Sequence, residues 1–259
     1  MDSCYACNQK ATSHEHVPPR CIFPELKDYP HKNFRKSLVT VPSCDDHNSK
    51  KSKDDEFLMV ALAGMLGNNS IGYIHSITKV NRALRRTSFR LLDKVFVANR
   101  QEFQINIGNN RFINAIAGTP DLERLKKCFE YIARGIYRHH HQRTFFGKVK
   151  SIESFLIVKD DSRKQLQRFL LDRARRDILW TEPHGENPDV FCYEIIEPDE
   201  FGLELVGLKF YGHIEIYCAM IPEGIDEPNH LGFELMKRGM PVTFTIDEKE
   251  YPVHIEKIV

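Results

Sequence analysis

The stretch CYACNQKATSHEHVPP, residues 4 to 19, decides how the N-terminal part of this chain folds. It opens with the pair Cys4-x-x-Cys7, and a second pair, Cys44-x-x-His47, follows after 36 intervening residues. A two-residue spacer lets both side chains of a pair face one tetrahedral ion, and thiolate and imidazole are ligands that zinc prefers. The two pairs therefore predict a structural zinc site that organises the first fifth of the chain.

Composition is typical of a soluble globular protein. The 259 residues exceed the usual size of one domain, and 41% hydrophobic with 28% charged residues can form real cores. No apolar run is long enough to span a membrane, and the first residues, MDSCYACNQK, lack the pattern of a signal peptide. We therefore expect a cytoplasmic protein with no membrane partner. In that reducing compartment, seven cysteines, an odd count, favour metal binding over disulfides.

The segment between the two pairs carries a second signal. It contains the run Glu15-His16-Val17-Pro18-Pro19, and Asn48 stands directly after the last zinc ligand. Over residues 1–56 the sequence resembles the HNH endonucleases, also called the ββα-metal or His-Me finger family, in the branch where two zinc pairs bracket the catalytic hairpin. The resemblance implies that Glu15 and Asn48 bind a catalytic Mg²⁺ or Mn²⁺ and that His16 is the general base. It assigns the zinc cage to Cys4, Cys7, Cys44 and His47.

Elementary chemistry supports these roles independently of the resemblance. Successive side chains of a strand alternate, so Glu15 and His16 should face opposite sides, one toward a cation and one toward an attacking water. A carboxylate and an amide oxygen are hard ligands that suit Mg²⁺ or Mn²⁺. An imidazole with a pKa of ~6.5 can accept a proton near neutral pH, and the metal can neutralise charge on the leaving oxygen. The pattern therefore predicts hydrolysis of phosphodiester bonds.

Departures from the family pattern leave alternatives open. Aspartate is more frequent than glutamate at the position of Glu15, and close relatives often have cysteine in place of His47. In an alternative register His47 binds the catalytic metal, and the zinc site is then left with three ligands. The further helix histidine that supplies the last letter of HNH is absent from NSKKSKDDE, residues 48–56.

Periodicity predicts helices in the middle of the chain and strands towards its end. A buried helix is expected at 57–66, and an amphipathic helix with a basic outer face at 77–96. Two further helices are predicted, at about 119–143 and 162–176. Stretches rich in β-branched and aromatic residues predict strands, at 189–197, 203–221, 240–246 and 251–259.

The distribution of charged residues also divides the chain into three parts. Residues 1–70 are neutral, residues 71–150 carry 16 basic and 5 acidic side chains, and residues 151–259 carry 12 and 22, so the net charges are 0, +11 and −10. The expected fold is α+β with three units: a zinc-bound HNH unit (1–66), a basic helical region (67–150) and an acidic, mainly β region of unknown role (151–259).

The basic region predicts a surface that binds a polyanion. The alternative is that it pairs with the acidic region, because the two charges nearly cancel. The candidate DNA contacts are His14, Lys50, Lys51, Arg82, Arg85 and Arg86. Ordinary exposed side chains remain the alternative interpretation of the histidine and the two lysines.

Together these features predict a DNA endonuclease of the HNH class, with structural Zn²⁺ and catalytic Mg²⁺ or Mn²⁺, acting in restriction, phage defence or a mobile element. Residues 57–259 would position the substrate, form a homodimer or receive an activating partner. One alternative is a zinc-ribbon-like module that binds nucleic acid or protein without chemistry; another is an RNase or toxin with the same site. Glu15, His16 and Asn48 favour an enzyme, because a binding module does not need them.

Overall fold

The computed structural model describes residues 3–48, 52–106, 108–156, 160–199, 202–225, 242–246 and 249–253. The chain begins with an antiparallel hairpin, β1 (Ser13–His16) and β2 (Thr40–Ser43), in which His16 lies opposite Thr40. A short 3-10 helix, η1 (Arg20–Ile22), follows β1, and α1 (Asp45–Asn48) follows β2. The N-terminal unit is therefore a two-stranded hairpin followed by a helix.

The middle of the chain starts with helices. After α2 (Ser52–Ala63), the elements α3 (Ser70–His75), the π-helical turn η3 (Ser76–Val80) and α4 (Asn81–Arg86) form one continuous helix, which is capped by Asn69 through the amide of Gly72. Positive φ angles at Ser88 (49°) and Phe89 (62°) end it, and α5 (Arg90–Val95) then begins in a new direction. The single helix expected over 77–96 was wrong, because left-handed backbone interrupts a helix.

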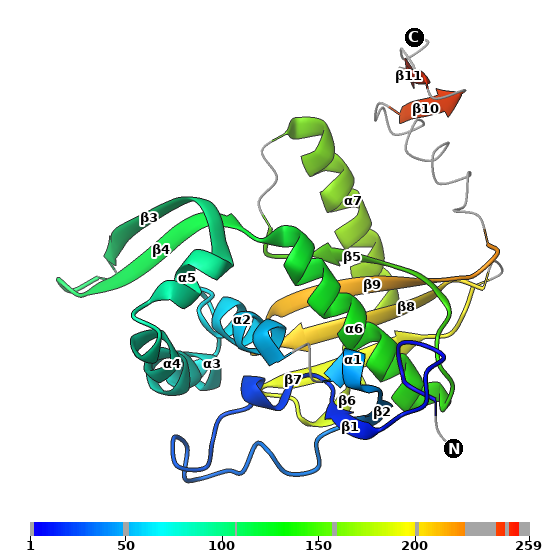
Figure 1. Cartoon of the computed structure of the whole chain (residues 1–259). Helices are drawn as coiled ribbons and strands as arrows, with labels where there is room; N and C mark the ends of the chain where they lie inside the picture. The colour runs from blue at the N-terminus through cyan, green and yellow to red at the C-terminus, as the bar shows by residue number, and fades with distance from the viewer. Residues whose placement is uncertain are drawn as a thin grey trace.

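A long two-stranded ribbon follows, which the sequence did not predict. It consists of β3 (Phe96–Asn106) and β4 (Phe112–Pro120), and it extends from the body of the molecule (Figure 1). Nearly all side chains of β3 are exposed, so the strand has no buried face to produce an alternating hydrophobic pattern. The region 67–150 is therefore not purely helical.

The C-terminal region is an antiparallel sheet of five strands, in the order β5-β9-β8-β7-β6. Its strands are β5 (Gly147–Glu153), β6 (His184–Asn187), β7 (Phe191–Ile196), β8 (Glu204–Phe210) and β9 (Ile214–Pro222). The expected strands correspond to β7, β8 and β9, whereas β5 and β6 were missed. A separate hairpin pairs β10 (Val242–Ile246) with β11 (Lys249–Val253); the rest of the strand predicted at 251–259 lies outside the described residues.

Helices cover both faces of the sheet. The helix α6 (Leu122–His141) packs on one face, where Phe129 meets Phe210 with 6.4 Å between ring centroids, and it crosses the strands in Figure 1. The helix α7 (Asp161–Asp177) packs on the other face through Leu171 and Ala174 against Tyr217. Asp121 caps α6 and Asp160 caps α7, so α6 begins slightly later than the expected Thr119 cap.

One large buried cluster includes side chains from all three predicted units, among them Val17, Phe57, Phe129 and Phe210. The strand β5 also runs across the boundary expected at residue 150. The packing is especially close at Gly135 of α6, because a Cβ added there would lie 2.6 Å from a methyl carbon of Val17. The N-terminal hairpin is thus packed directly against the helix that covers the sheet.

Candidate functional site

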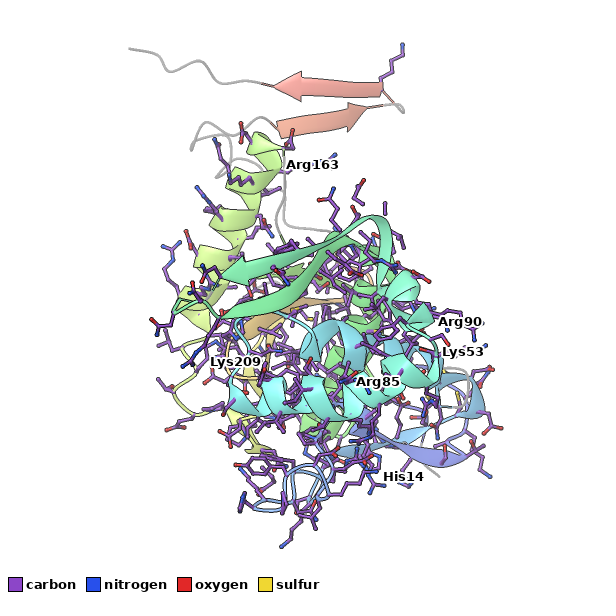
Figure 2. The ribbon with its side chains drawn as sticks, turned by 90° about the vertical axis from the view of Figure 1, so that its left-hand side faces the viewer. His14, Lys53, Arg85, Arg90, Arg163 and Lys209 are labelled. Carbon is purple, nitrogen blue, oxygen red and sulfur yellow. The ribbon has the colours of Figure 1, made fainter. Side chains whose placement is uncertain are left out.

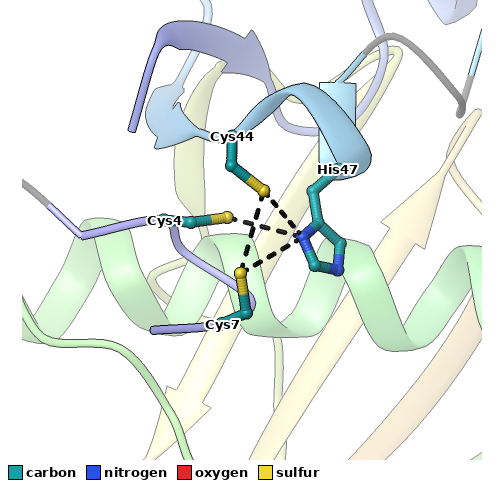
Figure 3. A group of neighbouring side chains, drawn as sticks. All are labelled: Cys4, Cys7, Cys44 and His47. Atoms are coloured by element: carbon teal, nitrogen blue, oxygen red, sulfur yellow. Dashed lines mark hydrogen bonds between the residues drawn. The ribbon is translucent and has the colours of Figure 1, made fainter. Parts of the chain in front are cut away.

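Four side chains of the N-terminal unit form one cluster (Figure 3), with their ligand atoms all within 4.8 Å of one another. The Nδ1 atom of His47 lies 3.2 Å from the Sγ of Cys44, 3.5 Å from that of Cys7 and 3.6 Å from that of Cys4. The Sγ atoms of Cys7 and Cys44 are 3.7 Å apart. Ligands around tetrahedral zinc are expected about 3.6 Å (S to N) and about 3.8 Å (S to S) apart. These residues therefore fit a metal ion such as zinc.

Within the ranges that the structure describes, this is the one group of cysteine, histidine and acidic side chains close enough to hold a metal ion. The expectation of metal ligands rather than disulfides is consistent with this, since no two of the seven cysteines, all of them within the described ranges, form a disulfide. His47 completes the four ligands, which favours the register in which it binds zinc over the one in which it binds a catalytic metal.

Hydrogen bonds join the cluster to both the hairpin and the body of the protein. The amide of Tyr5 donates to the carbonyl of Pro42 in β2 at 2.9 Å, and Thr144, after α6, donates to the carbonyl of Cys4 at 2.9 Å. The ring of Tyr131 on α6 meets the His47 ring edge-on, with 5.5 Å between centroids. The cluster therefore fixes α1 against the hairpin and is itself supported by α6.

Two of the three residues expected to perform chemistry, Glu15 and Asn48, lie beside residues of this cluster. Glu15 is buried, with 7% of its surface exposed, and its Oε2 accepts a long hydrogen bond of 3.5 Å from the Tyr5 hydroxyl. Burial raises the pKa of Tyr5 well above its usual value, and the Glu15 charge adds to this, so the hydroxyl remains a donor. The amide of Asn48 donates to Ser13 Oγ at 2.7 Å. Because Ser13 and Glu15 share a face of β1, Glu15 and Asn48 lie on the same side of the hairpin.

His16 faces the other side of β1 and is half-buried. Burial lowers the pKa of its imidazole, and the positive charge of Arg20 lowers it further. The ring is therefore neutral at physiological pH, which is the form that can accept a proton. Arg20 is an exposed residue that the sequence analysis missed, although the only signal available was its position four residues after His16.

The candidate DNA contacts differ in the partners that their side chains have in the structure. His14 is exposed on β1, and Lys50 and Lys51 lie outside the described residues. Arg82 donates to both carboxylate oxygens of Asp28 at 2.7 Å, and Arg86 donates to Glu56 at 2.6 Å. All three arginines are exposed, and the Nε of Arg85 donates to the neutral side chain of Asn81 at 3.2 Å.

The partners of these arginines bear on the alternative interpretation of the basic region. The ion pairs of Lys79, Arg82, Arg86 and Arg124 described here go to Glu25, Asp28, Asp54 or Glu56, all in the first 66 residues. Part of the basic charge therefore holds the helices against the N-terminal unit, rather than against the acidic C-terminal region.

No family model, curated protein or solved structure gives a significant match to this chain. The HNH resemblance therefore stays a prediction, and we infer the function from the geometry of the site. In the residues that the structure describes, no helix is both long and apolar enough to cross a membrane.

Proposed function

We propose that this protein is a metal-dependent endonuclease of the HNH type that hydrolyses phosphodiester bonds in DNA. The observation that carries the proposal is the different environment of two adjacent residues on β1. Glu15 is buried on the side of Asn48, whereas His16 is half-exposed and lies beside Arg20. The cluster of Cys4, Cys7, Cys44 and His47 is hydrogen-bonded to the hairpin whose strand β1 carries both residues.

Each of these side chains has a definite role in hydrolysis. Glu15 and the amide oxygen of Asn48 would hold Mg²⁺ or Mn²⁺, which when bound supplies positive charge to the phosphate and the leaving oxygen. His16 would take a proton from a water as the water oxygen bonds to phosphorus and the bond from phosphorus to the leaving oxygen breaks. Arg20 would attract the phosphate to the side of the strand on which His16 lies.

A zinc-binding module without chemistry is the rival proposal. Such a module requires the four ligands of the cluster, but it has no use for a neutral imidazole beside an exposed guanidinium. An RNase would use the same groups, because attack on phosphorus by an activated water does not require deoxyribose. The basic charge of residues 71–150 is compatible with either nucleic acid.

The test is cleavage of supercoiled plasmid and of a structured RNA with Mg²⁺, with Mn²⁺ and without added divalent metal. We expect metal-dependent nicking of the plasmid. Glu15→Ala should greatly weaken the dependence on added metal while the zinc content stays at one ion per chain. Glu186→Ala, which removes an exposed carboxylate from β6, is the matched control and should behave like the wild type. Cleavage of RNA alone would favour the RNase, and no cleavage of either substrate would favour the binding module.

A further inference from the structure

The continuous helix Ser70–Arg86 carries an exposed row of side chains that the proposed chemistry does not use. Tyr73 is 58% exposed and Ile77 is 50% exposed, although large apolar side chains are usually covered. The half-buried Asn81 and the exposed Arg85 continue the row at four-residue spacing, and Arg85 Nε donates to Asn81 Oδ1 at 3.2 Å. We call Tyr73, Ile77, Asn81 and Arg85 the outer stripe.

Other side chains of the same helix fix it to the N-terminal unit. Lys79 and Arg82 form ion pairs with Glu25 and Asp28, which lie between η1 and β2. Hydrogen bonds from Lys27 and Lys79 lower the pKa of Glu25 to about 2, so this anchor keeps its charge at neutral pH. The helix is thus attached to the segment that follows His16, and its outer stripe is held in a constant position relative to the candidate catalytic strand.

The charge of the helix favours one kind of partner. The sequence from Ser70 to Arg86 contains four basic residues and no acidic residue. Three of the four form ion pairs with acidic side chains of the N-terminal unit, whereas Arg85 donates to the neutral Asn81. Further basic side chains are exposed: in the view of Figure 2, Arg85 lies on the helix that crosses the middle, with Lys53 and Arg90 to one side and His14 below. A positively charged surface is complementary to an anionic partner, and the phosphate backbone of DNA is a dense row of such charges.

We propose that the outer stripe is the surface by which this protein binds duplex DNA, with the helix Ser70–Arg86 in the major groove. An α-helix fits that groove, where arginine pairs with guanine, asparagine pairs with adenine and an aliphatic side chain contacts the thymine methyl group. The stripe presents these three kinds of side chain, together with Tyr73, in a single row. The π-helical turn in the middle of the helix is of the kind often found at functional sites. The proposal depends on the proposed function only in naming DNA as the partner.

The test measures DNA binding separately from cleavage. Binding of a fluorescent 30-base-pair duplex of mixed sequence is followed by anisotropy without divalent metal, at several salt concentrations. Arg85→Ala should weaken binding by roughly 5- to 150-fold and lower the slope of log affinity against log salt by about 1. Tyr73→Ala and Ile77→Ala should weaken binding with little change in that slope. Lys164→Ala, which removes an exposed cation from α7, is the control and should bind like the wild type.

The outcomes separate this inference from the proposed function. If the wild type cleaves plasmid and all three stripe variants bind DNA normally, the stripe is not the DNA surface, although the nuclease stands. If the stripe variants lose binding but no protein cleaves, the DNA surface stands and the nuclease fails. Normal DNA binding together with a lower mass in light scattering for Tyr73→Ala would overturn the inference in favour of self-association. Unchanged zinc content and circular dichroism establish that each variant is folded.

Discussion

His75 should make the stability of this protein depend on pH in a way that can be calculated. Its side chain has no exposed surface, and its Nε2–H donates to the carbonyl of Cys21 at 3.0 Å. Its buried Nδ1 has no hydrogen bond to any residue that the structure describes. Burial, together with the positive charges of Lys79 and Arg35, lowers the pKa of His75 to about 4, although the Cys21 carbonyl and the charge of Asp28 act in the opposite direction. The folded protein therefore holds this imidazole neutral.

The direction of the pH dependence follows from the protonation of His75 in the folded and unfolded states. An unfolded histidine has a pKa of ~6.5, so below that pH the unfolded chain binds a proton that the folded chain excludes. The stabilisation is complete above about pH 6.5 and is lost as the pH falls toward 4. The difference of roughly 2.5 pKa units corresponds to about 3 kcal/mol in total, of which ~1.4 kcal/mol is lost by pH 5.5.

The assay is urea unfolding of the wild type and of His75→Gln at pH 7.5 and pH 5.5, with equal zinc in all samples. Glutamine retains a donor for the carbonyl of Cys21 but does not titrate. All other groups titrate in both proteins, so the difference between the two pH dependences isolates His75. We expect the wild type to lose ~1.4 kcal/mol more than the variant between these pH values. Equal losses in the two proteins would refute the reasoning.

Two further predictions concern the N-terminal unit. Cys44→Ser should release zinc and lower the melting temperature, because structural zinc sites contribute folding energy directly; an unchanged melting profile and zinc content would contradict the cluster. Gly135→Ala should destabilise the protein by about 1–3 kcal/mol, because the new Cβ would lie 2.6 Å from a Val17 methyl carbon and must displace the hairpin or α6. Stability equal to the wild type in urea would show that this contact is not close.

The parts of the fold that the sequence predicted are those with a strong local pattern. Ligand spacing alone placed Cys4, Cys7, Cys44 and His47 together, because two short spacers and one ion leave few arrangements. The helix α7 and the strands β7 to β9 also followed from periodicity, since each buries one face or both.

The missed parts depend on contacts between distant residues or on exposed surface. The strand β3 of the ribbon has little buried surface, so its hydrophobic pattern was not informative. The turn at Ser88 and Phe89 requires left-handed backbone at two residues that rarely adopt it, and such a turn leaves no clear signal in the sequence. The partners of Arg82 and Arg86 are 54 and 30 residues away in the sequence. Only the structure could show that these two arginines are ion-paired while Arg85 donates to the neutral Asn81.

The central claim is that His16 activates water for phosphodiester hydrolysis on a zinc-supported hairpin. The most direct measurement compares the rate of plasmid nicking in Mg²⁺ or Mn²⁺ by the wild type, His16→Ala and His31→Ala, each with matched zinc content. His31 is an exposed histidine of the same unit, outside the candidate site. The account predicts that His16→Ala lowers the rate by about 10²- to 10⁴-fold and that His31→Ala has no effect. Equal rates for the wild type and His16→Ala would contradict it.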